Sequence, residues 1–301
     1  MRLKLFLISI ALVLGIHYLD AKNRALLVGI GNYDETATGW KVIHGNNDVN
    51  LLSNRLKKKG FEIKTLTDRQ ATKGSIISAL SQLSESATAD DLVYIHFSGH
   101  GQLIQDLNKD EKEEYDQSFV CYDACFSPSY KVNGSPYKGQ NHLIDDELFP
   151  YINSIKKKVG SNGSVVVVFD SCYSGGADRG NMVDDPDPES DVEWDSTTRG
   201  ADDEFKLNKT AELFLRRLPA PGIYSTDGGS VTVISACKSD MKNYECKEKH
   251  SGRKYGTLSY CLSKLLDKGI PLTQWGNYFK NGTYKSLRVF RESQIPVVET
   301  H

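Results

Sequence analysis

Apolar and polar positions follow two alternating patterns along most of the chain. Short, almost uninterrupted apolar runs are typical of strands buried on both faces of a parallel sheet. Between them, apolar residues recur every three or four positions, as in amphipathic helices. The predicted strands are residues 24–31, 61–66, 91–97, 165–169, 231–236 and 295–298, and the predicted helices are 46–59, 73–83, 145–155, 205–218 and 256–266. The alternation predicts an α/β fold in which helices cover both faces of a mostly parallel central sheet.

Two regions break this alternation. Residues 102–140 are polar and loop-rich, and they separate two of the predicted strands. Residues 178–230 begin with an acidic, proline-bearing stretch, DDPDPESDVEWD, which predicts an exposed or disordered segment. At the start of the 46–59 helix, Asn47 or Asp48 is expected to be the cap.

The first 21 residues stand apart from the rest. Arg2 and Lys4 precede an apolar run at 5–16, and Ala21 follows polar residues. The run is short for a bilayer span, so residues 1–21 are interpreted as a secretory signal peptide, with an uncleaved membrane anchor as the alternative. We therefore expect an exported protein, periplasmic or secreted, with no membrane contact after the signal is removed.

Composition narrows the function classes. The 301 residues include 39% hydrophobic residues, enough for a full core, and the net charge of −2 gives no electrostatic case for nucleic-acid binding. We expect a monomer. Six cysteines are present, and in an exported protein some would be expected to form disulfides.

Two predicted strands end in residues that carry chemistry. The stretch VVVVFDSCYSGG, residues 165–176, delivers Cys172 to the carboxyl end of its strand, and DLVYIHFSGHG, residues 91–101, delivers His100 to the same edge. A histidine near a thiol supplies the base that makes it a nucleophile. A single cysteine would be better explained as a buried structural residue, but the pair favours a Cys–His catalytic dyad.

The motifs HFSGHG and DSCYSGG resemble the paired signatures of the metacaspases, which are caspase-like cysteine peptidases. The resemblance covers roughly residues 24–270. It implies a caspase-like three-layer sandwich and a peptidase domain at 22–301. That domain would consist of a large-subunit-like part, a mobile linker and a small-subunit-like part, at residues 22–177, 178–230 and 231–301. In animal caspases the histidine lies about fifty residues before the cysteine, so the longer separation here indicates an insertion.

The same residues suggest how a substrate would be held. The backbone N–H groups of Gly101 and Cys172 are the expected oxyanion donors. A pocket for Arg or Lys needs a buried carboxylate, and Asp170 and Asp48 both lie at this sheet edge, although Asp48 could instead be a helix cap. The resemblance to metacaspases implies that Asp48, Ser98 and Asp170 form the pocket for a basic residue before the cut.

Calcium is the expected cofactor, because hard cations bind clustered carboxylates. The resemblance implies Asp116, Asp145 and Asp146 as ligands, and Asp178 is the nearest candidate for a fourth. The alternative is that Asp145 and Asp146 only begin a helix, where carboxylates favour the dipole.

Self-processing is expected within the 178–230 segment, because proteases cut exposed flexible chain. Arg199, which is followed by glycine, is the first choice of site, and Arg217 is the second. Substrates are thus expected to be proteins or peptides with Arg or Lys before the cut. The rival interpretations are an inactive caspase-like binding module and a clostripain-like or legumain-like peptidase.

Overall fold

A computed structural model describes residues 21–105, 115–172, 188–201, 227–238 and 241–301. Residues 1–20 of the proposed signal segment, the predicted helix at 205–218, Asp178 and Arg217 lie outside the described residues. Within the described ranges, none of the helices is long and apolar enough to cross a membrane.

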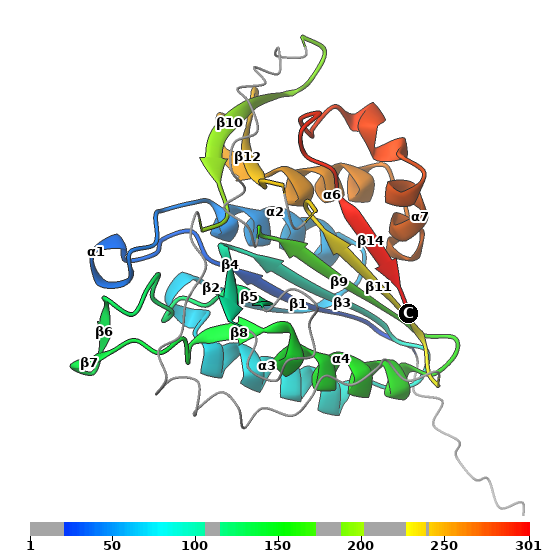
Figure 1. Ribbon diagram of the computed structural model, residues 1–301. Coiled ribbons are helices and arrows are strands. Elements are labelled where there is room, and N and C mark those ends of the chain that lie inside the picture. Colours follow the sequence, from blue (N-terminus) through cyan, green and yellow to red (C-terminus); the bar gives the residue numbers. More distant parts are fainter. Residues whose placement is uncertain (1–20, 106–114, 173–187, 202–226, 239–240) are drawn as a thin grey trace, which may run out of the picture.

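A six-stranded sheet forms the centre of the molecule (Figure 1). Five strands are parallel, and the sixth, β14, pairs antiparallel with β11 at one edge. Each strand falls within two residues of a predicted one. In spatial order they are β14 (Val297–Thr300), β11 (Ser230–Ser235), β9 (Ser164–Asp170), β3 (Leu92–Ser98), β1 (Asn23–Gly29) and β2 (Glu62–Thr67).

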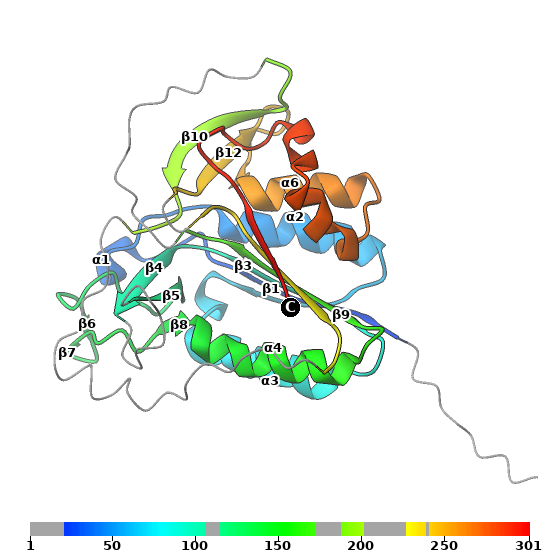
Figure 2. The same ribbon diagram turned by 45° about the vertical axis from the view of Figure 1, so that its right-hand side comes forward.

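Helices cover both faces of this sheet, which gives the predicted three layers (Figures 1 and 2). One face carries α2 (Gly45–Lys58), α6 (Thr257–Asp267) and α7 (Trp275–Lys280), and the other carries α3 (Lys73–Ser86) and α4 (Asp145–Val159). The remaining helical turns are α1 (Glu35–Thr38), η1 (Asp68–Gln70), η2 (Leu272–Gln274) and η3 (Thr283–Leu287).

The apolar strands have no polar alternation because each face has its own core. In β3, Val93, Ile95 and Phe97 join the cluster on the α3 and α4 side, whereas Tyr94 joins the cluster on the α2 and α6 side. Successive strand residues point to opposite faces, so both sets must be apolar. Burial on both faces therefore explains the pattern that predicted these strands.

The polar region at 102–140 is more ordered than its composition suggested. It contributes β4 (Gly101–Gln105) and β5 (Tyr115–Val120), which form a small antiparallel sheet with β8 (His142–Ile144). A two-residue pair, β6 (Lys131–Val132) and β7 (Ser135–Pro136), follows. Apolar residues of this sheet such as Ile104 and Phe119 join the core, but buried polar residues such as Gln102 and Ser118 lie between them, so its strands do not form an uninterrupted apolar run.

Residues 188–201, the described middle part of the 178–230 segment, differ from the expectation of an exposed linker. Within it, β10 (Val192–Thr198) pairs antiparallel with β12 (Tyr244–Glu248), which in turn pairs with β13 (Lys254–Gly256). The strand has acidic residues on one side, while Val192 is buried. Its pairing partner lies some fifty residues later in the chain, which local composition does not reveal.

The expected disulfides are absent. All six cysteines lie in the described part of the chain, and each is buried as a free thiol. Cys121 and Cys125 belong to one core cluster, while Cys246 and Cys261 belong to the other, across the sheet. Burial in separate layers keeps Cys121 and Cys125 from pairing with Cys246 or Cys261.

Candidate active site

His100 and Cys172 lie just beyond the carboxyl ends of two neighbouring strands. In the pairing of β3 with β9, Ser98 is opposite Asp170, so the next residues of both chains emerge side by side at one edge of the sheet. Both side chains are almost completely buried. The fold thus brings the predicted pair to one place through strand register alone.

The imidazole of His100 is held in one tautomer. Its Nε2 lies 2.9 Å from the backbone oxygen of Lys41, and because a carbonyl oxygen only accepts, Nε2 carries the proton. Burial, with help from the charge of Arg199, lowers the pKa of His100 to about 4, so at neutral pH the ring is neutral and Nδ1 is basic. Nδ1 is buried and makes no hydrogen bond to the described residues. The Lys41 carbonyl is an orienting group that side-chain patterns do not reveal.

The thiol of Cys172 is held as a proton donor. Its Sγ lies 2.8 Å from the backbone oxygen of Met241. A carbonyl oxygen favours the protonated thiol over a thiolate because the oxygen itself carries partial negative charge. The residue is thus described in its resting, protonated form.

Asp48, Ser98 and Asp170 form the wall of one buried pocket. The hydroxyl of Ser98 donates to Asp48 Oδ2 at 2.6 Å, and the backbone N–H of Gly256 donates to Asp48 Oδ1 at 3.1 Å. The helix α2 begins at Gly45 with His44 at its N-cap, where no side chain caps the backbone. The expected cap at Asn47 or Asp48 is therefore wrong, and the carboxylate of Asp48 serves the pocket instead.

Asp170 is fixed by donors from two other elements. Its Oδ2 accepts hydrogen bonds from the backbone N–H and the hydroxyl of Ser259, at 2.7 and 2.5 Å. Its Oδ1 accepts from Asn243 Nδ2 at 2.7 Å. Behind Ser259, the ring of His96 bonds to the Ser259 hydroxyl and to Tyr94, so a buried polar chain continues away from the pocket.

The side chain of Arg199 fills this pocket. Its Nη1 donates to Asp48 Oδ2 and to the Ser98 hydroxyl, each at 2.7 Å, and lies 3.6 Å from Asp170 Oδ2. Its Nε and Nη2 both reach Glu245 Oε1, at 3.1 and 2.8 Å. Arg199 and the three carboxylates are completely inaccessible to solvent. Arg199 was expected on an exposed segment; its burial is explained by these carboxylates.

The backbone at Arg199 lies across the candidate catalytic groups. Its carbonyl oxygen accepts from the N–H groups of Gly101 and Cys172, at 3.0 and 3.1 Å. The backbone N–H of Arg199 donates to the backbone oxygen of Asn243 at 3.0 Å, and the backbone N–H of Ala201 donates to the backbone oxygen of Gly101 at 3.1 Å. The segment is thus held from both sides as an extended strand, with its carbonyl at the two expected oxyanion donors.

Charge in the pocket is distributed unevenly. Burial raises the pKa of Asp48 to about 7, with Arg199 opposing this shift and Asp170 adding to it. Burial also disfavours the charge of Glu245, but Arg199 and His44 outweigh it and lower its pKa to about 2. For Arg199, the three carboxylates outweigh burial and raise the pKa further. Glu245 is therefore the firmly ionised partner.

Three residues of the pocket, Asn243, Glu245 and Gly256, were missed from the sequence. A Cβ at position 256 would lie 2.2 Å from Asp170 Oδ2 and 2.3 Å from Arg199 Nη1, so only glycine leaves room for the guanidinium. All three lie in or beside β12 and β13. The sequence stretch carries no motif of its own, since an isolated glutamate on a short strand is ordinarily a surface residue.

The acids expected to bind calcium are arranged less tightly. Asp116 lies on β5, whose pairing with β8 brings it towards the start of α4, where Asp145 and Asp146 lie. Asp116 and Asp146 are buried, whereas Asp145 is exposed. Among the described residues, no three or more histidines, cysteines or acids form a group that could hold a metal ion. Calcium binding at these acids therefore stays a prediction.

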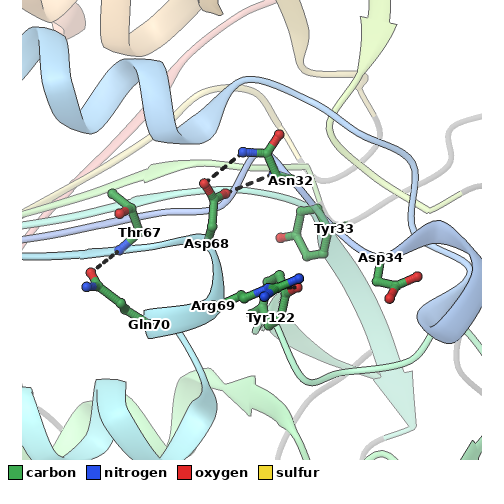
Figure 3. Close-up of a pocket in the computed structure, with 8 residues that line it drawn as sticks. All are labelled: Asn32, Tyr33, Asp34, Thr67, Asp68, Arg69, Gln70 and Tyr122. Atoms are coloured by element: carbon green, nitrogen blue, oxygen red, sulfur yellow. Dashed lines mark hydrogen bonds between the residues drawn. The ribbon is translucent and has the colours of Figure 1, made fainter.

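A separate pocket has a volume of about 540 Å³. Tyr33, Asp68 and Arg69, from the loops after β1 and β2, are among the residues that line it (Figure 3). The Tyr33 hydroxyl accepts from the His100 backbone N–H at 3.2 Å and donates to the Val120 oxygen at 2.8 Å. Asp68 accepts from the backbone N–H groups of Gly31 and Asn32 and from two asparagine side chains. Asp68 and Tyr33 therefore hold the loop after β1 against the site.

The fold and this arrangement agree with the family comparison. Residues 22–301 match the model of the caspase domain, and the chain belongs to the caspase-domain family. The predicted caspase-like fold is thereby confirmed, and the crystal structure of protein GSU0716 from Geobacter sulfurreducens has a similar fold, with a TM-score of 0.61 over 93% of each chain at 17% identity.

Several curated relatives are metacaspases. Metacaspase-1B of Aspergillus fumigatus is 32% identical over 166 residues, which cover 52% of this chain and 36% of that protein. Metacaspase-1 of Pyricularia oryzae is 30% identical over 166 residues, covering 52% of this chain and 37% of that protein. The chain thus matches little more than a third of the length of these relatives. The resemblance to metacaspases predicted from the two motifs is confirmed.

Proposed function

We propose that this protein is a cysteine endopeptidase that cleaves peptide bonds after arginine or lysine, with Cys172 and His100 as its dyad. The observation that carries the proposal is the position of Arg199. Its side chain is enclosed by three carboxylates while its carbonyl accepts from the N–H groups of Gly101 and Cys172. A substrate residue before a cleaved bond needs this same combination of charge recognition and oxyanion contact.

The chemistry follows from the protonation states. His100 Nδ1 takes the proton of the Cys172 thiol, and the sulfur attacks the carbonyl carbon of the substrate. The carbonyl π pair moves onto oxygen, where the N–H groups of Gly101 and Cys172 stabilise the negative charge. When the C–N bond breaks, protonated His100 gives its proton to the leaving amine. Water, deprotonated by His100, then hydrolyses the thioester and restores the thiol.

Self-processing after Arg199 is part of the proposal. Of the two expected sites, only Arg199 lies in the described part of the chain. The peptide bond between Arg199 and Gly200 lies close to Cys172, because a Cβ added at position 200 would be 3.1 Å from the Cβ of Cys172. The uncut chain then blocks its own pocket. Cleavage would give a fragment that starts at Gly200, and the free pocket would accept other substrates.

The test of self-processing compares three full-length proteins. Wild type should yield a fragment whose N-terminal sequence starts at Gly200, while Cys172→Ala stays intact. Arg199→Gln should also stay uncut at this bond, yet hydrolyse added arginine peptides without a lag because glutamine does not fill the acidic pocket. Cleavage in the Cys172→Ala protein would point to a contaminating protease, and an intact but fully active wild type would remove the processing step.

The test of the peptidase itself uses Cys172→Ala and His100→Ala. Each should lose peptide hydrolysis by about a thousandfold or more, because removal of a catalytic group leaves only binding and the oxyanion contacts. A thiol-reactive peptide ending in arginine should label Cys172 in the wild type. Folded, unlabelled and inactive wild-type protein would favour the caspase-like binding module. Cleavage after asparagine would favour a legumain-like enzyme.

Calcium stimulation is a second proposal, supported by the family resemblance and by the register that brings Asp116 towards Asp145 and Asp146. Among the described residues, these acids are not part of a group of three or more that could hold a metal ion, and the steps proposed above are assigned to Cys172, His100 and Gly101. We also propose export through residues 1–21 and a monomeric state without nucleic-acid partners, on the sequence grounds given above. Size-exclusion chromatography and sequencing of the mature N-terminus test these two.

A further inference from the structure

We propose that Glu245 makes the pocket selective for arginine over lysine, and that His44 positions it; this inference rests on the proposed peptidase function. Glu245 lies on β12, on the opposite side of the guanidinium from Asp48. Asp48, Ser98 and Asp170 contact one terminal nitrogen, Nη1. Among the described residues, Glu245 Oε1 is the partner of the other two nitrogens, Nε and Nη2.

A lysine side chain cannot satisfy both sides of this pocket. Its single ammonium nitrogen corresponds in position along the chain to the guanidinium carbon, whereas arginine spreads its donors in a planar fork. An ammonium that moves towards Asp48 withdraws from Glu245, and one that moves towards Glu245 withdraws from Asp48. Each acid keeps its hydrogen bonds to the protein, from His44 for Glu245 and from Ser98 and Gly256 for Asp48. Because both acids are completely buried, the acid that loses the cation is neither solvated nor neutralised by it, which is the costly case. The preference for arginine over lysine thus arises from the buried carboxylate that a lysine ammonium does not contact.

His44 keeps Glu245 in the right place and ionised. The backbone N–H of His44 donates to Glu245 Oε1 at 2.8 Å, and its ring Nδ1 lies 2.6 Å from Oε2. The second oxygen is therefore already occupied, and Oε1 is directed at the guanidinium. His44 is the N-cap residue of α2, the same helix that carries Asp48. One helix therefore orients the acids on both sides of the arginine.

The experiment compares two fluorogenic peptides that differ only in arginine or lysine before the cut. Wild-type protein should favour arginine by about 100-fold in kcat/KM, because a site built for several donors rejects the side chain that lacks them. Glu245→Gln removes the charge that lysine leaves unpaired, so the preference should fall below about tenfold. Glu193→Gln, a surface change on the adjacent strand β10, is the matched control and should keep the wild-type ratio.

The ratio of kcat/KM for the arginine peptide to that for the lysine peptide tests the role of Glu245 separately from the proposed peptidase activity. Hydrolysis of neither peptide by the folded wild type would remove the peptidase proposal itself. Equal hydrolysis of both, or an unchanged preference in Glu245→Gln, would leave the peptidase intact and overturn the role of Glu245. Should Glu245→Gln fold poorly by circular dichroism, Glu245→Asp keeps the charge but withdraws it from the guanidinium, and it should lower the ratio as well.

A second readout uses the chain as its own substrate. Arg199→Lys should slow the appearance of the Gly200 fragment by about 100-fold in the wild-type background and by less than tenfold in the Glu245→Gln background. His44→Ala should lower the arginine preference while the arginine peptide is still cleaved, as expected for a positioning residue. An arginine preference as large in His44→Ala as in wild type would show that Glu245 needs no positioning.

Discussion

The pocket around Arg199 and the group of Asp116, Asp145 and Asp146 are both acidic, but the fold treats them differently. In the pocket, Asp48 and Asp170 are completely buried and receive hydrogen bonds from fixed donors in other elements. In the second group, Asp145 is exposed at the first turn of a helix. Buried carboxylates that the protein itself anchors are specific for one cation shape, whereas carboxylates at a helix start also serve the helix dipole.

The two acidic groups also differ in how the protein itself offsets their negative charge. The pocket holds a guanidinium of the same chain, which offsets part of the negative charge of its three carboxylates without any ligand. The calcium proposal depends on further ligands beyond the described residues. We therefore expect substitutions in the pocket to have large effects on activity, and changes at the second group to have small ones.

Among substitutions in the two acidic groups and the residues that pack against them, the largest effect is expected from Gly256→Ala. The added methyl group would occupy the space of the guanidinium, 2.3 Å from Nη1, so all three carboxylate contacts are lost together. Peptide hydrolysis after arginine should fall by about 1,000-fold, since both charge recognition and placement of the reacting bond are removed. Gly74→Ala adds the same methyl to α3 in open space and should be neutral. Near-normal kcat/KM in Gly256→Ala would show that substrates bind elsewhere.

Asp170→Asn should have the next largest effect. The substitution keeps the size of the side chain but removes a buried charge and mismatches the donors of Ser259 and Asn243. Loss of one partner from a buried ion pair costs about 3 kcal/mol, or about 100-fold in kcat/KM for arginine peptides. Asp267→Asn, which alters a surface pair with Arg55, is the control. Equal losses in the two variants would indicate a general effect on stability.

The pH dependence should show a smaller effect, centred on Asp48. Its pKa is raised to about 7 by burial, so the carboxylate is ionised above this pH and becomes neutral below it. The attraction for an arginine side chain is lost on acidification, and kcat/KM should fall by up to about tenfold between pH 8 and pH 6. His100, with a pKa of about 4, stays neutral throughout this range. In Asp48→Asn this step should disappear, and its persistence would assign it to another group.

The smallest effect is expected at the second acidic group. Millimolar calcium should raise peptide hydrolysis severalfold, and a chelator should reverse this. The effect is expected to be modest because calcium needs about six to eight oxygen ligands, of which these aspartates supply only a part. The double variant Asp145→Asn, Asp146→Asn should respond less to calcium and keep its basal activity. Chelator-insensitive turnover at full rate would assign these aspartates to the start of α4 alone.

The sequence by itself determined the central sheet and the sheet edge at which the two residues of the proposed dyad lie. The runs that became β3 and β9 are short and apolar on both faces, which is typical of a buried parallel strand. His100 and Cys172 follow these strands directly. Their proximity required only that parallel neighbours end at the same edge, which is a local rule.

Only the tertiary structure decided what fills and completes the pocket. Glu245 and Gly256 lie on short strands with no motif, and Arg199 lies in a segment whose composition suggested an exposed linker. The pairing of β10 with β12, and of β12 with β13, brings all three together from distant parts of the chain. A buried arginine is stable only where acids from several elements surround it, and that arrangement is a property of three-dimensional contact rather than of any local pattern.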